Sequence, residues 1–230
     1  MATSTVENYV KQLYLLEQER PGAPVLMGAL ARAMRVVPGT ATTMVKALAK
    51  AGLARHMPRV GARLSPAGER LALQILRKHR LLEMFLVQTL GLDWSEIHEE
   101  AELLEHALSD RLVDRLDAFL GHPRVDPHGD PIPSAAGRMP ARAAIPLPDL
   151  PVDQPARIAR ITRQDSEFLQ FIHAAGLHPG TSLRVKRRDP AADLLAIARA
   201  EGGEISLGGN AAGHILVEKE TPVRTPRTKH

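Results

Sequence analysis

A proline-rich segment, residues 121–151, divides this sequence into two parts with different hydrophobic patterns. Before it, apolar residues recur every three or four positions, which is the spacing of amphipathic helices. After it, short apolar stretches are separated by glycines, among them Gly202-Gly203 and Gly208-Gly209, as in strands joined by turns. The segment itself shows no sustained period and predicts an extended, semi-rigid linker. We therefore expect a mainly α protein with a small β domain near its C-terminal end.

The first part has the element order of a winged helix-turn-helix. Helices are predicted over 6–18, 26–35 and 40–51, a two-stranded ribbon over 53–59 and 61–64, and a long helix from Ser65 to about Leu90. Val37-Pro38-Gly39 is predicted to be the turn before the third helix, and Gly52 suits the left-handed residue that ends it. Ser65 followed by Pro66 has the chemistry of a helix start. This order indicates a DNA-binding domain over 1–65.

The remaining elements are predicted as two helices, the linker and a barrel. One helix begins at Asp93 or Ser95 and ends near Leu108, and Ser109 opens another to Leu120, so a helical domain is expected over 66–122. Strands over 156–162, 182–187, 194–198, 204–207 and 214–217, with one helix over 166–175, suit a small barrel over 153–220. The linker is assigned to 123–152, and 221–230 are predicted to be a disordered basic tail.

Composition excludes several classes of protein. The 230 residues contain no cysteine, which rules out disulfides, thiolate zinc sites and cysteine nucleophiles. Because no apolar run is long enough to span a membrane and no secretory signal is visible, we expect a cytoplasmic protein without a membrane partner. The 30 Lys and Arg against 26 Asp and Glu permit a nucleic-acid partner. Aromatic residues make up 3%, which argues against binding single strands by base stacking.

The recognition helix of a helix-turn-helix presents its N-terminal residues to base edges in the major groove. The threonines at those positions can bond to bases or phosphates and place methyl groups against thymine, and no Arg, Asn or Gln stands there as a bidentate base reader. Specificity would therefore depend on thymine contacts and DNA shape, while the basic ribbon suits phosphate contacts. The alternative is a three-helix subdomain whose threonines only cap helices. The predicted DNA-binding residues are Arg32, Arg35, Gly39, Thr40, Thr42, Thr43, Lys46, Arg55, Arg59 and Arg63.

The strongest chemical signal is a set of His and Glu residues spaced to share one helix face: His98, Glu102, Glu105 and His106. Neighbouring carboxylates repel one another unless a cation or a proton joins them. A divalent cation bound by Glu102 and Glu105 would be neutralised by their two charges. His79 and Glu83 form a second pair on the preceding helix, and they would meet His98 if the two helices pack antiparallel.

Two other interpretations of this face remain open. It could be the solvated surface of a metal-free winged-helix or protein-interaction module. It could also serve a metallohydrolase, which would need an open coordination position and a positioned base or water. Because no pocket-forming α/β pattern or separate general base stands out, we expect neither enzyme activity nor a small organic substrate.

Several motifs around these residues resemble the metal-dependent repressors of the diphtheria toxin repressor family, including its manganese-responsive branch. They are Arg77-Lys78-His79-Arg80-Leu81-Leu82-Glu83, His98-Glu99-Glu100-Ala101 and Glu105-His106-Ala107-Leu108-Ser109-Asp110. The opening Glu7-Asn8-Tyr9-Val10-Lys11-Gln12-Leu13-Tyr14, the segment Gly129-Asp130-Pro131-Ile132-Pro133 and the barrel, as a FeoA-like domain, also fit. The resemblance covers nearly the whole chain. It implies a homodimer, a divalent corepressor, and a helical domain that binds metal and dimerises.

The resemblance further implies metal-strengthened binding to palindromic, double-stranded operators of metal-uptake genes. Its primary metal site corresponds to Asn8, Glu102, Glu105 and His106. Metal there would tie the first helix to the later one, so that two recognition helices fit successive major grooves. Iron-responsive members carry Cys where Glu102 stands, and a hard oxygen ligand favours Mn²⁺. The alternatives are an iron(II)-dependent repressor of the same family or another divalent transition metal.

This chain departs from the manganese sensors at two positions. They often have Asp where this chain has Asn8, and some have Glu where it has Lys11. A protonated Lys cannot act as a ligand, so a two-metal cluster is not expected at the primary site.

The family's ancillary site implies a second group of ligands, which correspond to His79, Glu83, His98 and, from the barrel, Asp165. Manganese regulators with the barrel carry Cys-Pro-His-Gly in the linker, where this chain has Asp126-Pro127-His128-Gly129. Asp126 and His128 are therefore candidates to join Glu83 and Asp165. The alternative for Asp126 is a plain loop residue.

Overall fold

The computed structural model describes residues 3–141 and 143–220, which fall into two compact units. The first unit comprises Met1–Leu82, Glu99–Arg124 and Ile132–Pro140, and the second comprises Glu83–His98, Val125–Pro131 and Ala141–His230. None of the helices in the described part combines the length and the apolar character that a bilayer crossing requires. The predicted tail over 221–230 lies outside the described residues.

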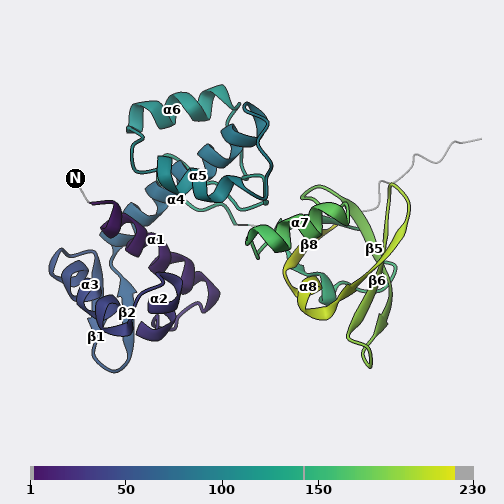
Figure 1. The fold of residues 1–230 in the computed structure, drawn as a ribbon, viewed down its shortest axis with the longest axis horizontal. Coiled ribbons are helices and arrows are strands. Elements are labelled where there is room, and N and C mark those ends of the chain that lie inside the picture. Colours follow the sequence, from purple (N-terminus) through teal and green to yellow (C-terminus); the bar gives the residue numbers. More distant parts are fainter. Residues whose placement is uncertain (1–2, 142, 221–230) are drawn as a thin grey trace, which may run out of the picture. The chain divides into compact units, whose positions relative to one another are not determined.

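The first unit begins with the predicted winged helix-turn-helix, which is drawn in purple and blue in Figure 1. Its elements are α1 (Ser4–Glu19), α2 (Met27–Ala33), α3 (Pro38–Lys50), β1 (Ala54–Met57), β2 (Gly61–Leu64) and the start of α4 (Pro66–Gln88). The two strands pair antiparallel, with Ala54 opposite Leu64. Pro38 and Gly39 form the first turn of α3 and not the predicted separate turn, because proline is tolerated where no helical N–H bond is needed.

The apolar faces of these helices share one core. It contains Val10 and Leu13 of α1, Leu48 of α3 and Leu73 of α4, each at most 4% exposed. Ser65 caps α4 as predicted, since its hydroxyl accepts the N–H of Gly68. Because α1 and α3 are packed into the same core, the position of α1 and the position of the recognition helix are mechanically linked.

Two shorter helices follow, α5 (Ile97–Leu104) and α6 (Asp110–Phe119). Ser109 caps α6 as predicted. The helix predicted to end near Leu108 stops at Leu104, although the Glu105 N–H still reaches the Ala101 carbonyl at 2.9 Å. Glu105 and His106 therefore lie in the turn that leaves α5.

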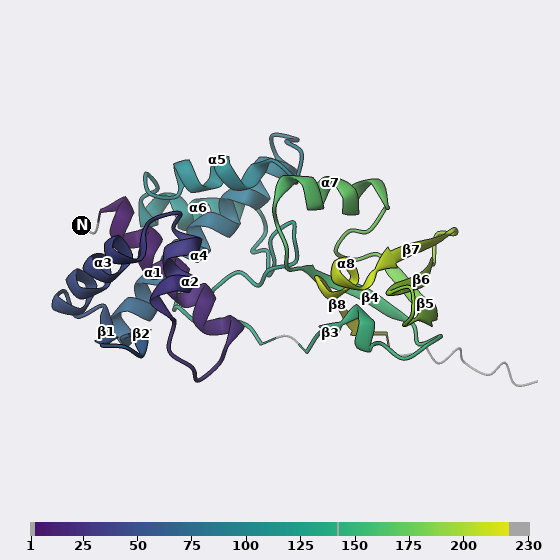
Figure 2. The same cartoon turned by 60° about the horizontal axis from the view of Figure 1, so that its bottom comes forward.

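The second unit is built on an antiparallel six-stranded sheet in the order β3-β8-β4-β5-β6-β7, which Figure 2 shows curving around its core. The elements are β3 (Ile145–Pro146), η1 (Leu147–Asp149), β4 (Ala156–Ile161), α7 (Ser166–Ala174), β5 (Ser182–Asp189), β6 (Leu194–Arg199), β7 (Glu204–Gly208), α8 (Gly209–Gly213) and β8 (Ile215–Lys219). Trp94, which follows α4, is buried in the same core as the strands. The five predicted strands are all present.

The predicted extended linker is folded in two places. Residues 125–131 form a loop closed by a bridge between Val125 and Pro131, with the His128 side chain fully buried. Further along, β3 joins the sheet, and Leu147 and Leu150 are buried in its core. Proline density predicts the absence of long regular elements, but it carries no information about which short segments dock on a core.

Gly129 in this loop is expected to be intolerant of any side chain. It has φ +88°, and a Cβ there would overlap the carbonyl oxygen of Ala159 on β4. Gly129→Ala should therefore lower the free energy of unfolding by about 3 kcal/mol, from strain and overlap together.

Gly137→Ala is the matched control, because Gly137 also has a positive φ (+68°) but no atom lies within 4 Å of the position that a Cβ would take there. It should cost only about 1 kcal/mol. Urea unfolding measures these costs. It is followed by circular dichroism for both variants and also by Trp94 fluorescence for Gly129→Ala. Equal costs for the two variants would contradict the close approach of the loop to β4.

Candidate metal centre

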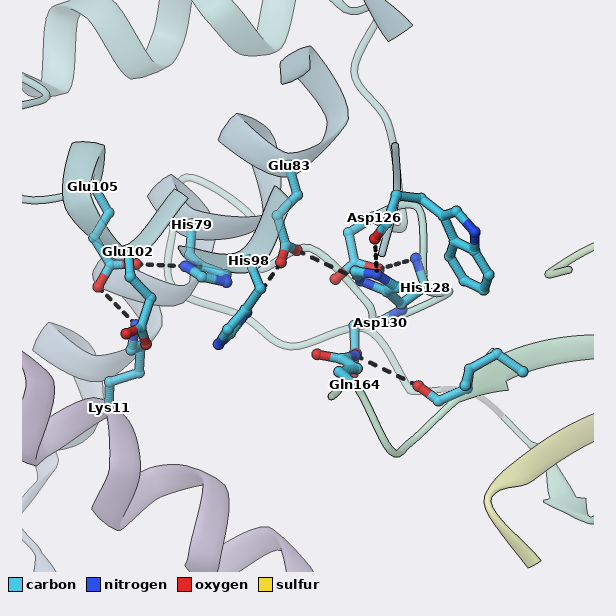
Figure 3. Close-up of polar contacts among 12 residues, drawn as sticks. Lys11, His79, Glu83, His98, Glu102, Glu105, Asp126, His128, Asp130 and Gln164 are labelled. Atoms are coloured by element: carbon cyan, nitrogen blue, oxygen red, sulfur yellow. Dashed lines mark hydrogen bonds and ion pairs between the residues drawn. The ribbon is translucent and has the colours of Figure 1, made fainter. Parts of the chain in front are cut away.

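Two acidic side chains at the end of α5 face Lys11 of α1 (Figure 3). The Lys11 Nζ lies 2.7 Å from Glu105 Oε1 and 3.1 Å from Glu102 Oε1. Lys11 is 2% exposed and Glu105 is fully buried. The other carboxylate oxygen of Glu105 lies 2.6 Å from Nδ1 of His79 on α4. Glu105 is thus bonded on both oxygens, and His79, which we predicted for the ancillary site, contacts a predicted ligand of the primary site.

His106 and Asn8 complete this first group. The His106 Nδ1 lies 2.6 Å from Glu7 Oε2, and its Nε2 is buried without a hydrogen-bond partner, 3.5 Å from Glu105 Oε1. With the hydrogen of Nδ1 donated to Glu7, the lone pair of Nε2 is left to accept. The Oδ1 of Asn8 is also buried without a partner. Each buried unsatisfied acceptor costs about 1–3 kcal/mol, so a donor or a cation placed between Asn8 Oδ1 and His106 Nε2 would be stabilising.

The donor set fits a divalent transition metal. Carboxylate and amide oxygens together with one imidazole nitrogen are ligands that Mn²⁺ and its neighbours accept. The Glu7–His106 hydrogen bond is the kind of outer contact that orients a ligating imidazole. Glu7 and the ion pairs of Lys11 were not predicted from the sequence. Lys11 follows Glu7 by four residues and Asn8 by three, spacings that bring it beside each of them on α1, and these spacings are the signal that the sequence offers.

A second group lies within the second unit. Ligand atoms of Glu83, Asp126 and His128, all buried, lie within 4.8 Å of one another. His128 Nε2 is 2.8 Å from the Trp94 carbonyl oxygen, so it carries the hydrogen, and Nδ1 has no hydrogen-bond partner, 4.0 Å from Glu83 Oε2. The predicted meeting of Glu83 and His98 also occurs, with His98 Nδ1 3.4 Å from Glu83 Oε1. The unpartnered imidazole nitrogen beside two carboxylates again suits a divalent cation.

Hydrogen bonds shape the loop that carries Asp126 and His128 (Figure 3) and attach it to β4 and to Gln164 just after that strand. Asp126 Oδ1 accepts the N–H groups of His128 and Asp130, both at 2.9 Å. The N–H of Ile161 on β4 donates to the His128 carbonyl. Asp130 is paired with Arg160 and accepts a hydrogen bond from Gln164. Asp126 is therefore at once the organiser of the loop and a member of the acidic group.

The structure does not bring Asp165 into this group. Its side chain caps α7 by accepting the N–H of Phe168, and it is paired with Arg163. The hydrogen bond from Arg163 is the main cause that lowers the pKa of Asp165. An Asp immediately before a helix is a preferred N-cap, and that local use takes up the oxygens that we had assigned to metal.

The chain matches three family models in succession. Residues 1–62 match the iron dependent repressor N-terminal DNA binding domain, 65–134 its metal binding and dimerisation domain, and 145–219 the FeoA domain. The iron-dependent repressor IdeR of Mycobacterium leprae is 33% identical over 173 residues, which cover 72% of this chain and 74% of that protein. The chain belongs to the diphtheria toxin repressor family. The diphtheria toxin repressor of Corynebacterium diphtheriae is 30% identical over 196 residues, 80% of this chain and 85% of that protein.

Solved structures of similar repressors extend over the same length. A manganese-dependent transcriptional repressor in complex with manganese has a TM-score of 0.86 and 39% identity, and covers 94% of this chain and 100% of that chain. ScaR with bound Cd²⁺ has a TM-score of 0.78 and 33% identity, with 94% and 99% covered. The predicted family and fold class are confirmed. This member of the diphtheria toxin repressor family is a metal-dependent, DNA-binding transcriptional repressor and not an enzyme, and its domains imply a DNA operator and a homodimer.

The residues predicted to contact DNA lie on α3, on the ribbon, and on α2 with the residues just after it. Most of them are exposed, namely Arg32, Arg35, Gly39, Thr40, Thr43, Lys46, Arg55 and Arg59. Thr42 and Thr43 donate their hydroxyl hydrogens to the carbonyls of Pro38 and Gly39, which leaves their oxygens as acceptors only. Arg63 is half-buried and donates to the Gly22 carbonyl. Its guanidinium is thus partly committed within the protein.

A matched pair of variants separates the two tasks of Asp126. In protein kept free of metal by a chelator, Asp126→Ala should lower the free energy of unfolding by about 1–3 kcal/mol, because two buried N–H groups lose their acceptor. Asp126→Asn keeps an oxygen at that position and should be as stable as the unmodified chain. Urea unfolding followed by Trp94 fluorescence measures both. A stable Asp126→Ala protein would show that the loop does not depend on this carboxylate.

Proposed function

We propose that this protein is a manganese-responsive repressor of metal-uptake genes, with a primary metal site made by Asn8, Glu102, Glu105 and His106. The observation that carries the proposal is the pair of buried, unpartnered acceptors, Asn8 Oδ1 and His106 Nε2, beside two carboxylates. Asn8 belongs to α1 and the other three to α5 and the turn after it. A shared divalent ion would neutralise the two carboxylates and satisfy both acceptors at once.

These residues would couple metal to DNA through α1. Asn8, Glu7 and Lys11 lie on the same helix as Val10 and Leu13, which are packed with α3 in one core. A restraint on the polar face of α1 therefore restrains the recognition helix. In a homodimer, the separation of the two recognition helices decides whether they fit successive major grooves. The effect is a population shift, whose size equals the difference in metal affinity between the DNA-competent state and the others.

The donor chemistry supports manganese over iron. The site offers oxygen and imidazole nitrogen, and a chain with no cysteine offers no thiolate. Similarity to structures described as manganese-dependent repressors, at 39% and 36% identity, supports the same choice. Later divalent metals bind such sites more tightly, so the metals must be compared at buffered free concentrations. The iron-dependent alternative would be favoured if the protein bound its operator at a free Fe²⁺ concentration below that of the cell. It would also have to fail to bind at a similar free concentration of Mn²⁺.

We also propose a second metal site made by Glu83, Asp126 and His128, with His98 beside Glu83. The buried, unpartnered Nδ1 of His128 supports it. His79 lies one helical turn before Glu83 on α4, and its Nδ1 contacts Glu105 of the first group. Asp165 is replaced in this proposal by Asp126, because its oxygens are engaged at the start of α7. Barrel and linker would thereby contribute directly to metal binding.

The homodimer is proposed to form through α5 and α6. Leu103, Leu112 and Phe119 expose 74%, 51% and 68% of their surface, within the region that matches the dimerisation domain. Apolar side chains exposed to this extent on neighbouring helices are typical of a covered interface. DNA would be contacted by α3 and the ribbon, through the exposed residues named above.

Removing one proposed ligand of the primary site, Glu102 or His106, tests the proposed function. Glu102→Ala and His106→Ala should abolish Mn²⁺-dependent operator binding, a loss of at least about 100-fold in affinity at saturating metal, because each removes a ligand and leaves its partners uncompensated. Fluorescence anisotropy with a labelled operator measures it. Glu99→Ala is the control, since Glu99 is an exposed residue of the same helix. A full metal response in Glu102→Ala and His106→Ala would refute the assignment.

The second site has its own reporter, because Trp94 is the chain's one tryptophan and its ring lies 5.3 Å from that of His128. Glu83→Gln and His128→Ala should bind one metal ion fewer per chain and lose the change in Trp94 fluorescence on Mn²⁺ addition. Glu102→Ala should retain that change. Equilibrium dialysis and a fluorescence titration provide the two readings, and an unchanged metal count in both second-site variants would contradict this site.

A further inference from the structure

Lys11 is a buried cation inside the group that the proposed function assigns to metal. Its Nζ is bonded to Glu105 at 2.7 Å and to Glu102 at 3.1 Å, and its side chain is 3% exposed. Burying an ammonium group costs several kcal/mol unless good partners offset it. Here both partners are carboxylates from another part of the chain, 91 and 94 residues away in sequence. The two ion pairs therefore connect α1 to the end of α5 without any metal.

The same contacts use atoms that a metal would need. Lys11 is bonded to Oε1 of Glu105, and His79 is bonded to Oε2, so both oxygens of that carboxylate already have a partner. The Glu102 side chain is 39% exposed, so water and salt screen its ion pair with Lys11 more than the buried pair between Lys11 and Glu105. The formal charge of the two carboxylates and Lys11 together is one negative unit, and without Lys11 it would be two. A divalent cation is attracted less to the first arrangement than to the second.

We propose that Lys11 is a built-in competitor of the metal, a tethered cation that holds α1 to the end of α5 before metal binds and that raises the metal concentration at which the primary site fills. This inference rests on the proposed function, and it adds a residue that sets the threshold of the response. Metal then strengthens a connection that exists already, through Asn8 and His106, instead of creating it.

The proposal predicts two effects of opposite sign when the charge of Lys11 is removed. Without metal, α1 loses its ion pairs and becomes more mobile. With metal, the site has one more unit of negative charge and binds Mn²⁺ more tightly. A lysine that only supports the fold would give effects of the same sign, because a loosened site would also bind metal more weakly.

The experiment compares Lys11→Met with Lys11→Arg, which keeps the charge. Lys50→Met is the control for loss of a lysine elsewhere, because Lys50 is an exposed residue at the end of α3. In chelator-stripped full-length protein, amide hydrogen exchange of α1 should be about tenfold faster in Lys11→Met and unchanged in the other two. Competition with a chromophoric chelator should show Mn²⁺ bound about tenfold more tightly by Lys11→Met and within about threefold of the unmodified protein by the others.

Unchanged exchange of α1, or Mn²⁺ affinity that is equal or weaker in Lys11→Met, would overturn the proposal. If Lys11→Met does not fold, as judged by circular dichroism, Lys11→Gln replaces the charge with a neutral donor and repeats both measurements. A wild-type protein that binds no Mn²⁺ would refute the proposed function and the competition with it. Faster exchange of α1 in the metal-free variant would then still establish Lys11 as the connection between α1 and α5.

Discussion

The buried carboxylate of Glu105 is the interaction on which the first unit depends. It accepts a hydrogen bond from Lys11 of α1 on one oxygen and lies against His79 of α4 on the other. A buried charge is tolerated only when it is paired, so this carboxylate fixes the relative positions of α1, α4 and the turn after α5. The DNA-binding core is packed on α1 and α4, and it therefore takes its position from the same charge.

The second unit also contains a buried carboxylate, Asp126, whose hydrogen-bond partners belong to its own loop. The Asp126 carboxylate accepts two backbone N–H groups and so shapes the turn that presents His128 to Glu83. β4 supports this turn through the Ile161 N–H and the close approach at Gly129. The barrel thus supports the loop that carries two of the proposed second-site ligands, Asp126 and His128. Trp94, whose indole N–H donates to His173 on α7, links that site to the barrel core.

Local chemistry in the sequence was sufficient for most elements and for the residue types of the site. Helical spacing predicted α1 to α4 and α7, and the hydroxyl caps at Ser65 and Ser109 marked two helix starts. The His and Glu spacing predicted an acidic, imidazole-containing group, and the structure brings Glu102, Glu105 and His106 against α1. Asp165 is not brought to the predicted group, because its oxygens cap the start of α7 and pair with Arg163.

The sequence by itself determined the order of the domains, the helix-turn-helix and the supply of hard ligands, since these follow from periods, caps and residue types within short windows. Only the tertiary structure decided which oxygen faces which cation. Lys11 meets Glu102 and Glu105 across 91 and 94 residues, and the proline-rich residues 125–131 fold into a buried loop because β4 offers them backbone partners. Such pairings depend on how distant segments share a core, and no local pattern encodes that arrangement.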